Sequence, residues 1–253
     1  MEIVRNLAYG THVRQVLDLY RPPGAREAPV VAFVHGGAFV RGAKDINPEM
    51  YGNVLTWFAR QGCVGVNIEY RLADEAPYPG GAADVAWACD WISRNIRQWG
   101  GSPNRVCLLG HSAGGTHVAT LLCNPLDGLR PIEIGCAVLV SARLRADTLP
   151  QNPNAAGVAA YFGSDVARYH ELSPATHAAR VSIPVMVANA EFENPLLDLY
   201  GLEFALTLGR ARGTAPPHLV LPDHNHVSIM AHFNTSEQWF GEQIIAFLER
   251  ACR

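Results

Sequence analysis

The chain has 253 residues, a length that suits one large domain. Apolar residues make up 49% of the chain and charged residues 17%, against a usual value of about 25%, so a sizeable core can form. The net charge of −3, without any run of Lys or Arg, excludes the basic surface that binds nucleic acid or an anionic membrane.

The chain also lacks the patterns of an exported or membrane protein. No apolar stretch reaches the roughly 20 residues that span a bilayer, and the first residues do not resemble a signal peptide. The six cysteines form no C-x-x-C pair, which indicates reduced thiols rather than a zinc or redox site. We therefore expect a cytoplasmic protein with no metal, no organic cofactor and no nucleic-acid or membrane partner. Low charge and five tryptophans are compatible with a homodimer.

Hydrophobic patterning predicts strands that alternate with helices. In chain order we expect an early strand containing Val13, Leu17 and Leu19, then strand 30–34, helix 51–60, strand 63–68, helix 82–99, strand 106–109, helix 113–122, strand 132–140, strand 183–187, helix 196–208, strand 218–221 and helix 237–248. Continuously apolar runs such as Val30–Val34 are typical of strands buried on both faces. The pattern predicts a single α/β domain over 1–253, with a mostly parallel central sheet and helices on both faces. The polar alternation at the start favours an open sheet that begins with antiparallel strands over a closed (β/α)₈ barrel.

Residues 143–178 do not fit this alternation. They lie between two predicted core strands and are rich in Ala, Pro, Asn and Tyr. A connection of this length inside a domain is usually functional. We expect a short lid over a site, with Leu144, Tyr161 and Phe162 as candidate pocket wall; an ordinary surface excursion is the alternative.

Residues 110–114 read Gly-His-Ser-Ala-Gly and lie between a predicted buried strand and a predicted helix. G-x-S-x-G in a strand–turn–helix context is typical of a nucleophile elbow. The turn is strained and needs small neighbours, which Gly110, Gly114 and Gly115 supply. Ser112 is therefore the candidate nucleophile. A serine hydroxyl is a weak nucleophile and needs a base within hydrogen-bond reach.

In this architecture the acid and then the histidine follow the serine along the chain. His226 lies after the last short strand and before the closing helix, and we predict it to be the base. We interpret His224 as a loop residue that contacts His226 or solvent. An acid must hold the imidazole in the correct tautomer. Glu193 is the predicted acid, Glu191 is the alternative, and Asp198 falls inside the next predicted helix.

The substrate oxyanion needs preorganised backbone N–H donors. His35-Gly36-Gly37-Ala38 directly follows a predicted buried strand and matches the loop that pairs with the residue after the nucleophile. The predicted donors are the amides of Gly37, Ala38 and Ala113. We expect His35 to hold the shape of the loop.

Together these residues resemble the hormone-sensitive-lipase-like carboxylesterases of the α/β-hydrolase superfamily, and still more the small carboxylesterase/arylformamidase branch near them. The stretches that carry the resemblance are His35–Phe39, Tyr70–Ala73, Ala76–Pro79, Gly110–Gly115, Glu193–Pro195 and Asn225–His226. The resemblance implies an α/β-hydrolase fold and a triad of Ser112, Glu193 and His226. Ala38 replaces the third oxyanion glycine of the family pattern and keeps its N–H.

The leading functional hypothesis is a serine hydrolase that cleaves small carboxylic esters through an acyl-enzyme on Ser112. An arylformamidase that cleaves an amide with the same machinery is the nearest alternative, because the motifs do not separate the two. A non-catalytic ligand-binding protein on the same fold is a third hypothesis. In each case the expected partner is a small molecule, an ester or an amide in the first two.

Overall fold

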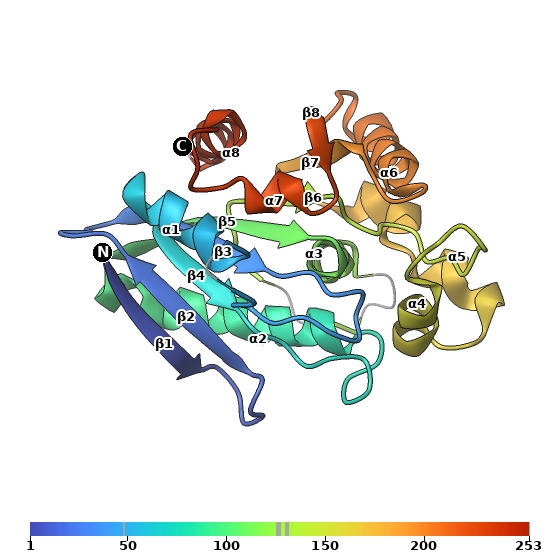
Figure 1. The fold of residues 1–253 in the computed structure, drawn as a ribbon, viewed down its shortest axis with the longest axis horizontal. Helices are drawn as coiled ribbons and strands as arrows, with labels where there is room; N and C mark the ends of the chain where they lie inside the picture. Colours follow the sequence, from blue (N-terminus) through green and yellow to red (C-terminus); the bar gives the residue numbers. More distant parts are fainter. Residues whose placement is uncertain (48, 125–127, 130–131, 253) are drawn as a thin grey trace.

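The computed structural model describes residues 1–47, 49–124, 128–129 and 132–252 (Figure 1). The strands are β1 (Glu2–Ala8), β2 (Val16–Arg21), β3 (Ala28–Val34), β4 (Val64–Ile68), β5 (Gly101–His111), β6 (Cys136–Val140), β7 (Val185–Phe192) and β8 (His218–Asn225). The α-helices are α1 (Gly52–Arg60), α2 (Gly80–Asn95), α3 (Ala113–Cys123), α4 (Ala155–Phe162), α5 (Tyr169–Leu172), α6 (Leu197–Arg212), α7 (Ser228–Ala231) and α8 (Trp239–Ala251). Short 3₁₀ helices are η1 (Ile96–Trp99), η2 (Val166–Arg168) and η3 (Pro174–Arg180).

The strands form one sheet in the order β1-β2-β4-β3-β5-β6-β7-β8. β2 pairs antiparallel with both β1 and β4, and every later pairing is parallel. β3 pairs with β4 on one side and β5 on the other, from Val30 to Val34. The prediction of a mostly parallel sheet that begins with antiparallel strands is confirmed.

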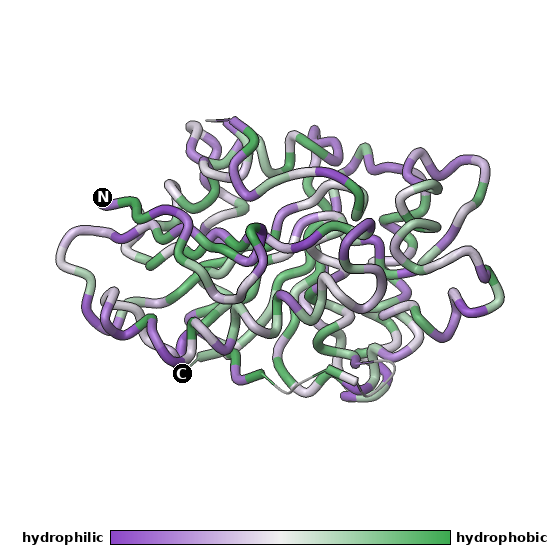
Figure 2. Tube along the Cα trace, turned by 90° about the horizontal axis from the view of Figure 1, so that it is seen from below, coloured by the Kyte–Doolittle hydropathy of each residue, from purple (hydrophilic) through white to green (hydrophobic). Residues whose placement is uncertain are grey.

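The central strands are apolar throughout because both faces of the sheet are covered. Val30, Ala32 and Val34 of β3 belong to a core cluster with side chains of α2, α3 and α6. The intervening Val31 and Phe33 belong to a second cluster with side chains of α1 and α8. Since successive side chains of a strand point to opposite faces, one apolar run builds both layers. Figure 1 shows α1 and α8 on one side of the sheet and α2 on the other. Figure 2 shows that apolar residues are concentrated toward the centre of the molecule.

Some predicted boundaries were wrong. Val13 lies in the turn between β1 and β2 and is 82% exposed, while β1 itself was not predicted. β1 is an edge strand whose residues are mostly exposed, so it carries no apolar signal. β6 begins at Cys136 rather than at residue 132, and β7 continues to Phe192.

The segment over 143–178 contains α4, η2, α5 and most of η3. Tyr161 and Phe162 pack with Phe39 in a third apolar cluster. Leu144 is instead fully buried in the first core cluster, so its expected place in a pocket wall is not observed. Within the described ranges, no helix is both long enough and apolar enough to cross a membrane. All six cysteines are free thiols, and five of them are buried.

A buried ionic group ties the start of the chain to the loop after β3. His35 Nδ1 lies 2.7 Å from the carbonyl oxygen of Gly36, and its Nε2 lies 3.0 Å from Glu69 Oε1. The Glu69 carboxylate only accepts, so His35 Nε2 donates its N–H to it. Glu69 also contacts the Arg14 guanidinium and accepts the Lys44 N–H at 2.9 Å. Burial raises the pKa of Glu69, but the hydrogen bond and charge of His35 outweigh burial and hold it below its usual value.

We predict that Glu69→Gln lowers the free energy of unfolding by about 3–5 kcal/mol at pH 7, because it removes the carboxylate that pairs with Arg14 and hydrogen-bonds His35. A carboxyl group with a lowered pKa in the folded state stabilises the fold above its ordinary value of 4.5. This stabilisation disappears as the pH falls through the folded pKa. Urea unfolding of both proteins measures the difference, which should shrink in acid. Glu75→Gln, at an exposed pair with His12, is the control. If the free energies of unfolding of wild type and Glu69→Gln differed by the same amount at pH 7 and in acid, the result would contradict the ion pair.

Candidate active site

Ser112 occupies a strained turn between β5 and α3. Its backbone has φ 54° and ψ −121°, an unusual conformation for a residue with a side chain. Such a conformation costs on the order of 1–3 kcal/mol and persists only where the surroundings impose it. A Cβ on Gly114 would lie 2.2 Å from the carbonyl oxygen of Val34, so only glycine lets α3 begin this close to β3. The turn presents the Ser112 hydroxyl at the end of the sheet, as the elbow motif predicts.

The structure brings Ser112, His226 and Glu193 together. His226 Nε2 lies 2.9 Å from Ser112 Oγ, and His226 Nδ1 lies 3.2 Å from Glu193 Oε2. The carboxylate only accepts, so Nδ1 carries the proton and Nε2 is free to accept the serine O–H. This arrangement can draw the proton from the hydroxyl and stabilise the imidazolium that results.

Each of these side chains comes from the carboxyl end of a parallel strand. Ser112 follows β5, Glu193 follows β7 and His226 follows β8. Open α/β sheets bind ligands at this edge because the connecting loops meet there. The topology therefore explains how residues separated by up to 114 positions meet.

The structure distinguishes between the candidate acids by position. The Glu193 carboxylate is 3% exposed and bonds His226, while its Oε1 has no hydrogen-bond partner among the described residues. Glu191 is exposed and accepts the backbone N–H of Asp223 at 2.8 Å. Asp198 is exposed in the first turn of α6. Of the three, Glu193 therefore has the position that an orienting acid requires.

The interpretation of His224 was wrong. Its side chain is 4% exposed and does not face solvent. Its Nε2 lies 2.6 Å from Glu237 Oε1, and its Nδ1 lies 3.1 Å from Ser228 Oγ. His224 thus joins β8 to the segments around α7 and α8 rather than contacting the His226 ring.

The predicted oxyanion loop follows β3 with an unusual backbone. Gly37 has φ 147° and Ala38 has φ 51°, and the carbonyl of Gly37 accepts the Arg41 N–H at 3.0 Å. A Cβ on Gly36 would lie 2.9 Å from Ser112 Cβ, so the loop lies against the nucleophile. Ala113 is the first residue of α3, where helix amides have no intrahelical acceptor. The donor roles of Gly37, Ala38 and Ala113 stay predictions.

Sequence reasoning missed two residues that connect this loop to the histidine. The Gly36 N–H donates to Tyr51 Oη at 3.1 Å, and the Tyr51 hydroxyl lies 3.1 Å from His111 Nδ1. His111 Nε2 donates to the carbonyl of His226 at 2.9 Å. Burial raises the pKa of Tyr51 to about 12, and burial with the neighbouring His226 lowers the pKa of His111 well below its usual value. Both groups are therefore neutral, which suits this chain of donors and acceptors.

The lid segment packs onto the oxyanion loop. Phe39 stacks on Tyr161 with ring centroids 4.7 Å apart. A Cβ on Gly157 of α4 would lie 2.1 Å from the carbonyl oxygen of Ala38. The segment over 143–178 is thus in direct contact with the backbone that we predict to bind the oxyanion, and its role as a lid stays a prediction.

Another group of side chains near this edge could hold a metal ion. The ligand atoms of His224, His232 and Glu237 all lie within 4.8 Å of one another. Their spacing along the chain matches no metal-binding motif, so a metal site was not predicted from the sequence.

The strand order, and the position of the Ser112–His226–Glu193 line at the carboxyl edge of the sheet, match the α/β-hydrolase fold. The BD-FAE family model matches residues 17–127. Esterase LipC of Mycobacterium tuberculosis is 38% identical over 119 residues, which are 46% of this chain and 28% of LipC. Carboxylesterase NlhH of the same species is 37% identical over 109 residues, 41% of this chain and 32% of NlhH. The aligned part of the chain thus spans less than a third of these relatives.

Solved structures share the whole fold. Esterase B from Lactobacillus rhamnosis superposes with a TM-score of 0.84 at 21% identity, over 99% of this chain and 86% of that one. A truncated carbohydrate esterase from gut microbiota gives a TM-score of 0.81 at 15% identity, over 100% and 97% of the two chains. The α/β-hydrolase fold and the resemblance to hormone-sensitive-lipase-like carboxylesterases are confirmed.

We predict that Tyr51→Phe slows the reaction of Ser112 with a fluorophosphonate by about tenfold or more. The change removes the hydroxyl that bonds the Gly36 N–H and His111, and His111 in turn bonds the backbone of His226, so the reacting groups are positioned less precisely. Two buried polar groups lose their partner, so the free energy of unfolding should also fall by about 1–3 kcal/mol. Labelling rates and urea unfolding measure both effects. Tyr169→Phe, which removes a hydroxyl bonded to Gly163 in the lid segment, is the matched control. Equal labelling rates for the two variants would contradict a positioning role for Tyr51.

Proposed function

We propose that the protein is a serine hydrolase of small carboxylic esters, a short-chain carboxylesterase that forms an acyl-enzyme on Ser112. The observation that carries the proposal is the hydrogen-bonded line from Ser112 Oγ through His226 to Glu193. The esterase names of LipC and NlhH support the same chemistry. The relatives reported above are esterases, and no feature of the site favours the formamidase alternative.

In the proposed first step His226 Nε2 takes the Ser112 proton as Oγ attacks the ester carbonyl. Glu193 stabilises the imidazolium without accepting its proton. The imidazolium then gives the proton to the alcohol as the C–O bond breaks. Water, activated by the same histidine, attacks the acyl-enzyme and releases the carboxylic acid.

Negative charge on the carbonyl oxygen develops beside the loop after β3 and the start of α3. In the proposal the amides of Gly37, Ala38 and Ala113 bind this oxyanion. Each preorganised donor of this kind typically contributes about 10²–10³ in turnover. The segment over 143–178 serves as the lid in this proposal, and the stacking of Tyr161 on Phe39 places it against the loop after β3. A single domain, a cytoplasmic location and a homodimer remain predictions.

We predict turnover of p-nitrophenyl acetate and butyrate that exceeds turnover of the octanoate, with Ser112→Ala reduced to less than about a thousandth of wild type. Ser112 supplies the attacking oxygen, so its loss removes the covalent route. Release of p-nitrophenol measures the rates, and circular dichroism checks the fold of the variant. N-formyl-kynurenine is assayed alongside. A much higher kcat/KM for deformylation would replace the ester proposal by the formamidase alternative, and an active Ser112→Ala would remove the nucleophile assignment.

We predict that Glu193→Gln lowers kcat far more than Glu191→Gln does. The first change removes the charge that orients His226 and stabilises its cation, while the second affects an exposed contact with Asp223. The two changes are chemically identical and two residues apart, so each controls for the other. Steady-state kinetics on p-nitrophenyl acetate decides between them. The reverse order would assign the acid to Glu191.

A further inference from the structure

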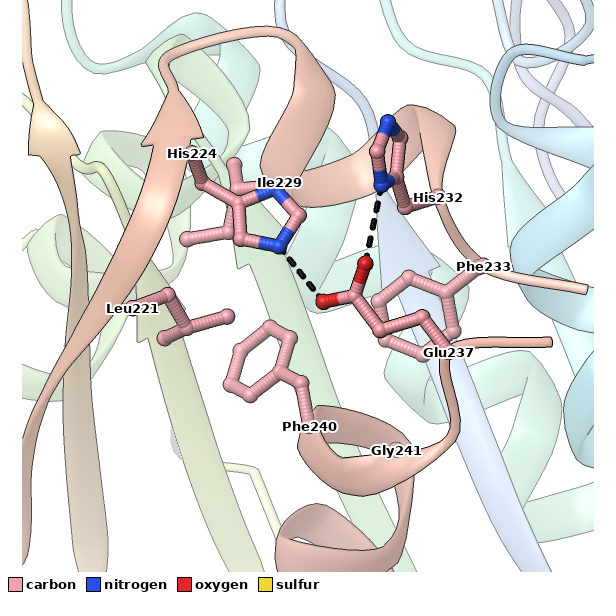
Figure 3. A pocket seen from close by; sticks show the side chains of 8 residues that line it. All are labelled: Leu221, His224, Ile229, His232, Phe233, Glu237, Phe240 and Gly241. Atoms are coloured by element: carbon pink, nitrogen blue, oxygen red, sulfur yellow. Dashed lines mark hydrogen bonds and ion pairs between the residues drawn. The ribbon is translucent and has the colours of Figure 1, made fainter. Parts of the chain in front are cut away.

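Three side chains converge beside the proposed triad without belonging to it. His224 lies at the end of β8, His232 follows α7, and Glu237 precedes α8 (Figure 3). His224 Nε2 lies 2.6 Å from Glu237 Oε1, and His232 Nδ1 lies 2.9 Å from Glu237 Oε2. Figure 3 shows both imidazoles directed at the one carboxylate.

We propose that His224, His232 and Glu237 form a binding site for one divalent transition-metal ion, with Zn²⁺ as the best-suited ion. Two imidazoles and one carboxylate form a ligand set that zinc uses in proteins, with water in the fourth position. Imidazole nitrogen disfavours Ca²⁺ and Mg²⁺, which prefer oxygen ligands. The site goes beyond the proposed ester hydrolysis and does not depend on it.

The present spacing of the ligand atoms suits such an ion after a small adjustment. All three lie within 4.8 Å of one another. In a tetrahedral site with metal–ligand distances of about 2.0–2.2 Å, neighbouring donors lie about 3.4 Å apart. The two imidazole–carboxylate contacts, at 2.6 and 2.9 Å, would lengthen to this spacing. The side chain of His232 is 52% exposed and can turn toward His224, which burial holds in place.

Ser228 lies where a supporting partner for His224 is needed. Its Oγ is 3.1 Å from His224 Nδ1 and accepts the Asn225 N–H at 2.9 Å. A histidine that binds metal through one ring nitrogen normally donates its other N–H to a fixed acceptor. In the present structure the Glu237 carboxylate only accepts, so His224 Nε2 donates its N–H to it. A bound ion would displace that proton, and the Nε2 lone pair would then face the ion while Nδ1–H is donated to Ser228.

The three side chains line a small pocket, and its volume limits what can bind there. Its volume is about 10 Å³, close to the space that one water-sized particle needs, so an organic ligand does not fit. Apolar side chains of Leu221, Ile229, Phe233 and Phe240 form part of its wall. Glu237 is 44% exposed, which leaves the ion a route from solvent. An apolar wall strengthens binding because it weakens competition from water.

A bound ion would join the end of β8 to the segment between α7 and α8. His226 lies between the first two ligands in the chain. Occupation of the site would therefore restrict the segment that carries His226, and it should raise the temperature of unfolding, because the ion binds the folded chain alone.

The test uses the full chain after dialysis against EDTA. We expect calorimetry to show one Zn²⁺ per chain, and Co²⁺ to give the visible absorption of a tetrahedral site. His232→Ala removes an exposed ligand and should weaken binding at least about tenfold while abolishing the Zn²⁺-dependent rise in Tm. Glu237→Gln keeps the shape of the side chain and should weaken binding in the same way.

His12→Ala is the matched control, because His12 also contacts a carboxylate, that of Glu75 at 3.2 Å, but as an exposed pair without a third ligand. This variant should bind Zn²⁺ like wild type. Absence of stoichiometric binding by wild type, or equal affinity in wild type and His232→Ala, would overturn the proposal. Binding that is lost in His226→Ala but retained in His232→Ala would overturn it too, since the ion would then lie at the triad. None of these outcomes depends on ester hydrolysis, so failure of one proposal does not affect the other.

Discussion

The strained backbone at Ser112 is the constraint on which the rest of the site depends. A residue with a side chain is held at φ 54° because its neighbours leave no other path from β5 into α3. The Ser112 N–H donates to the Val140 carbonyl at the end of β6 at 2.9 Å. The Thr116 hydroxyl in α3 donates to the Arg143 carbonyl at 2.8 Å. Two neighbouring strands and a helix therefore fix the direction of one hydroxyl group.

The other parts of the site are aligned to this turn by buried polar contacts. Tyr51 bonds the loop after β3 and lies against His111, and His111 bonds the backbone of His226. On the other side of the same loop, His35 is held by Glu69. Buried hydrogen bonds of this kind specify one arrangement, because any other leaves polar groups without partners. The contacts that position the groups around Ser112 thus come from residues in or directly after strands β3, β4, β5 and β8.

The parts that could be predicted from the sequence are those with a local cause. The elbow around Ser112 needs small residues at fixed spacing, and His226 follows from chain order. Glu193 was predicted as the acid with Glu191 as the alternative, because only the position of the imidazole distinguishes two carboxylates two residues apart. Tyr51 and His111 meet across 60 residues, and no motif links the two positions. The edge strand β1 was missed because most of its side chains face solvent and it lacks an apolar pattern.

The contact between Gly157 and the Ala38 carbonyl has a consequence for evolution and engineering of the lid. α4 touches the backbone of the loop itself, and the contact leaves no room for a Cβ. Substitutions in α4 that alter its packing on this loop would therefore also move the amides after Gly37. Under the proposed function, selectivity and turnover would then be linked, so variants that exchange one substrate for another by changing α4 should also change in rate. A route to altered selectivity that spares the rate has to begin on the side of the lid that faces away from Ala38.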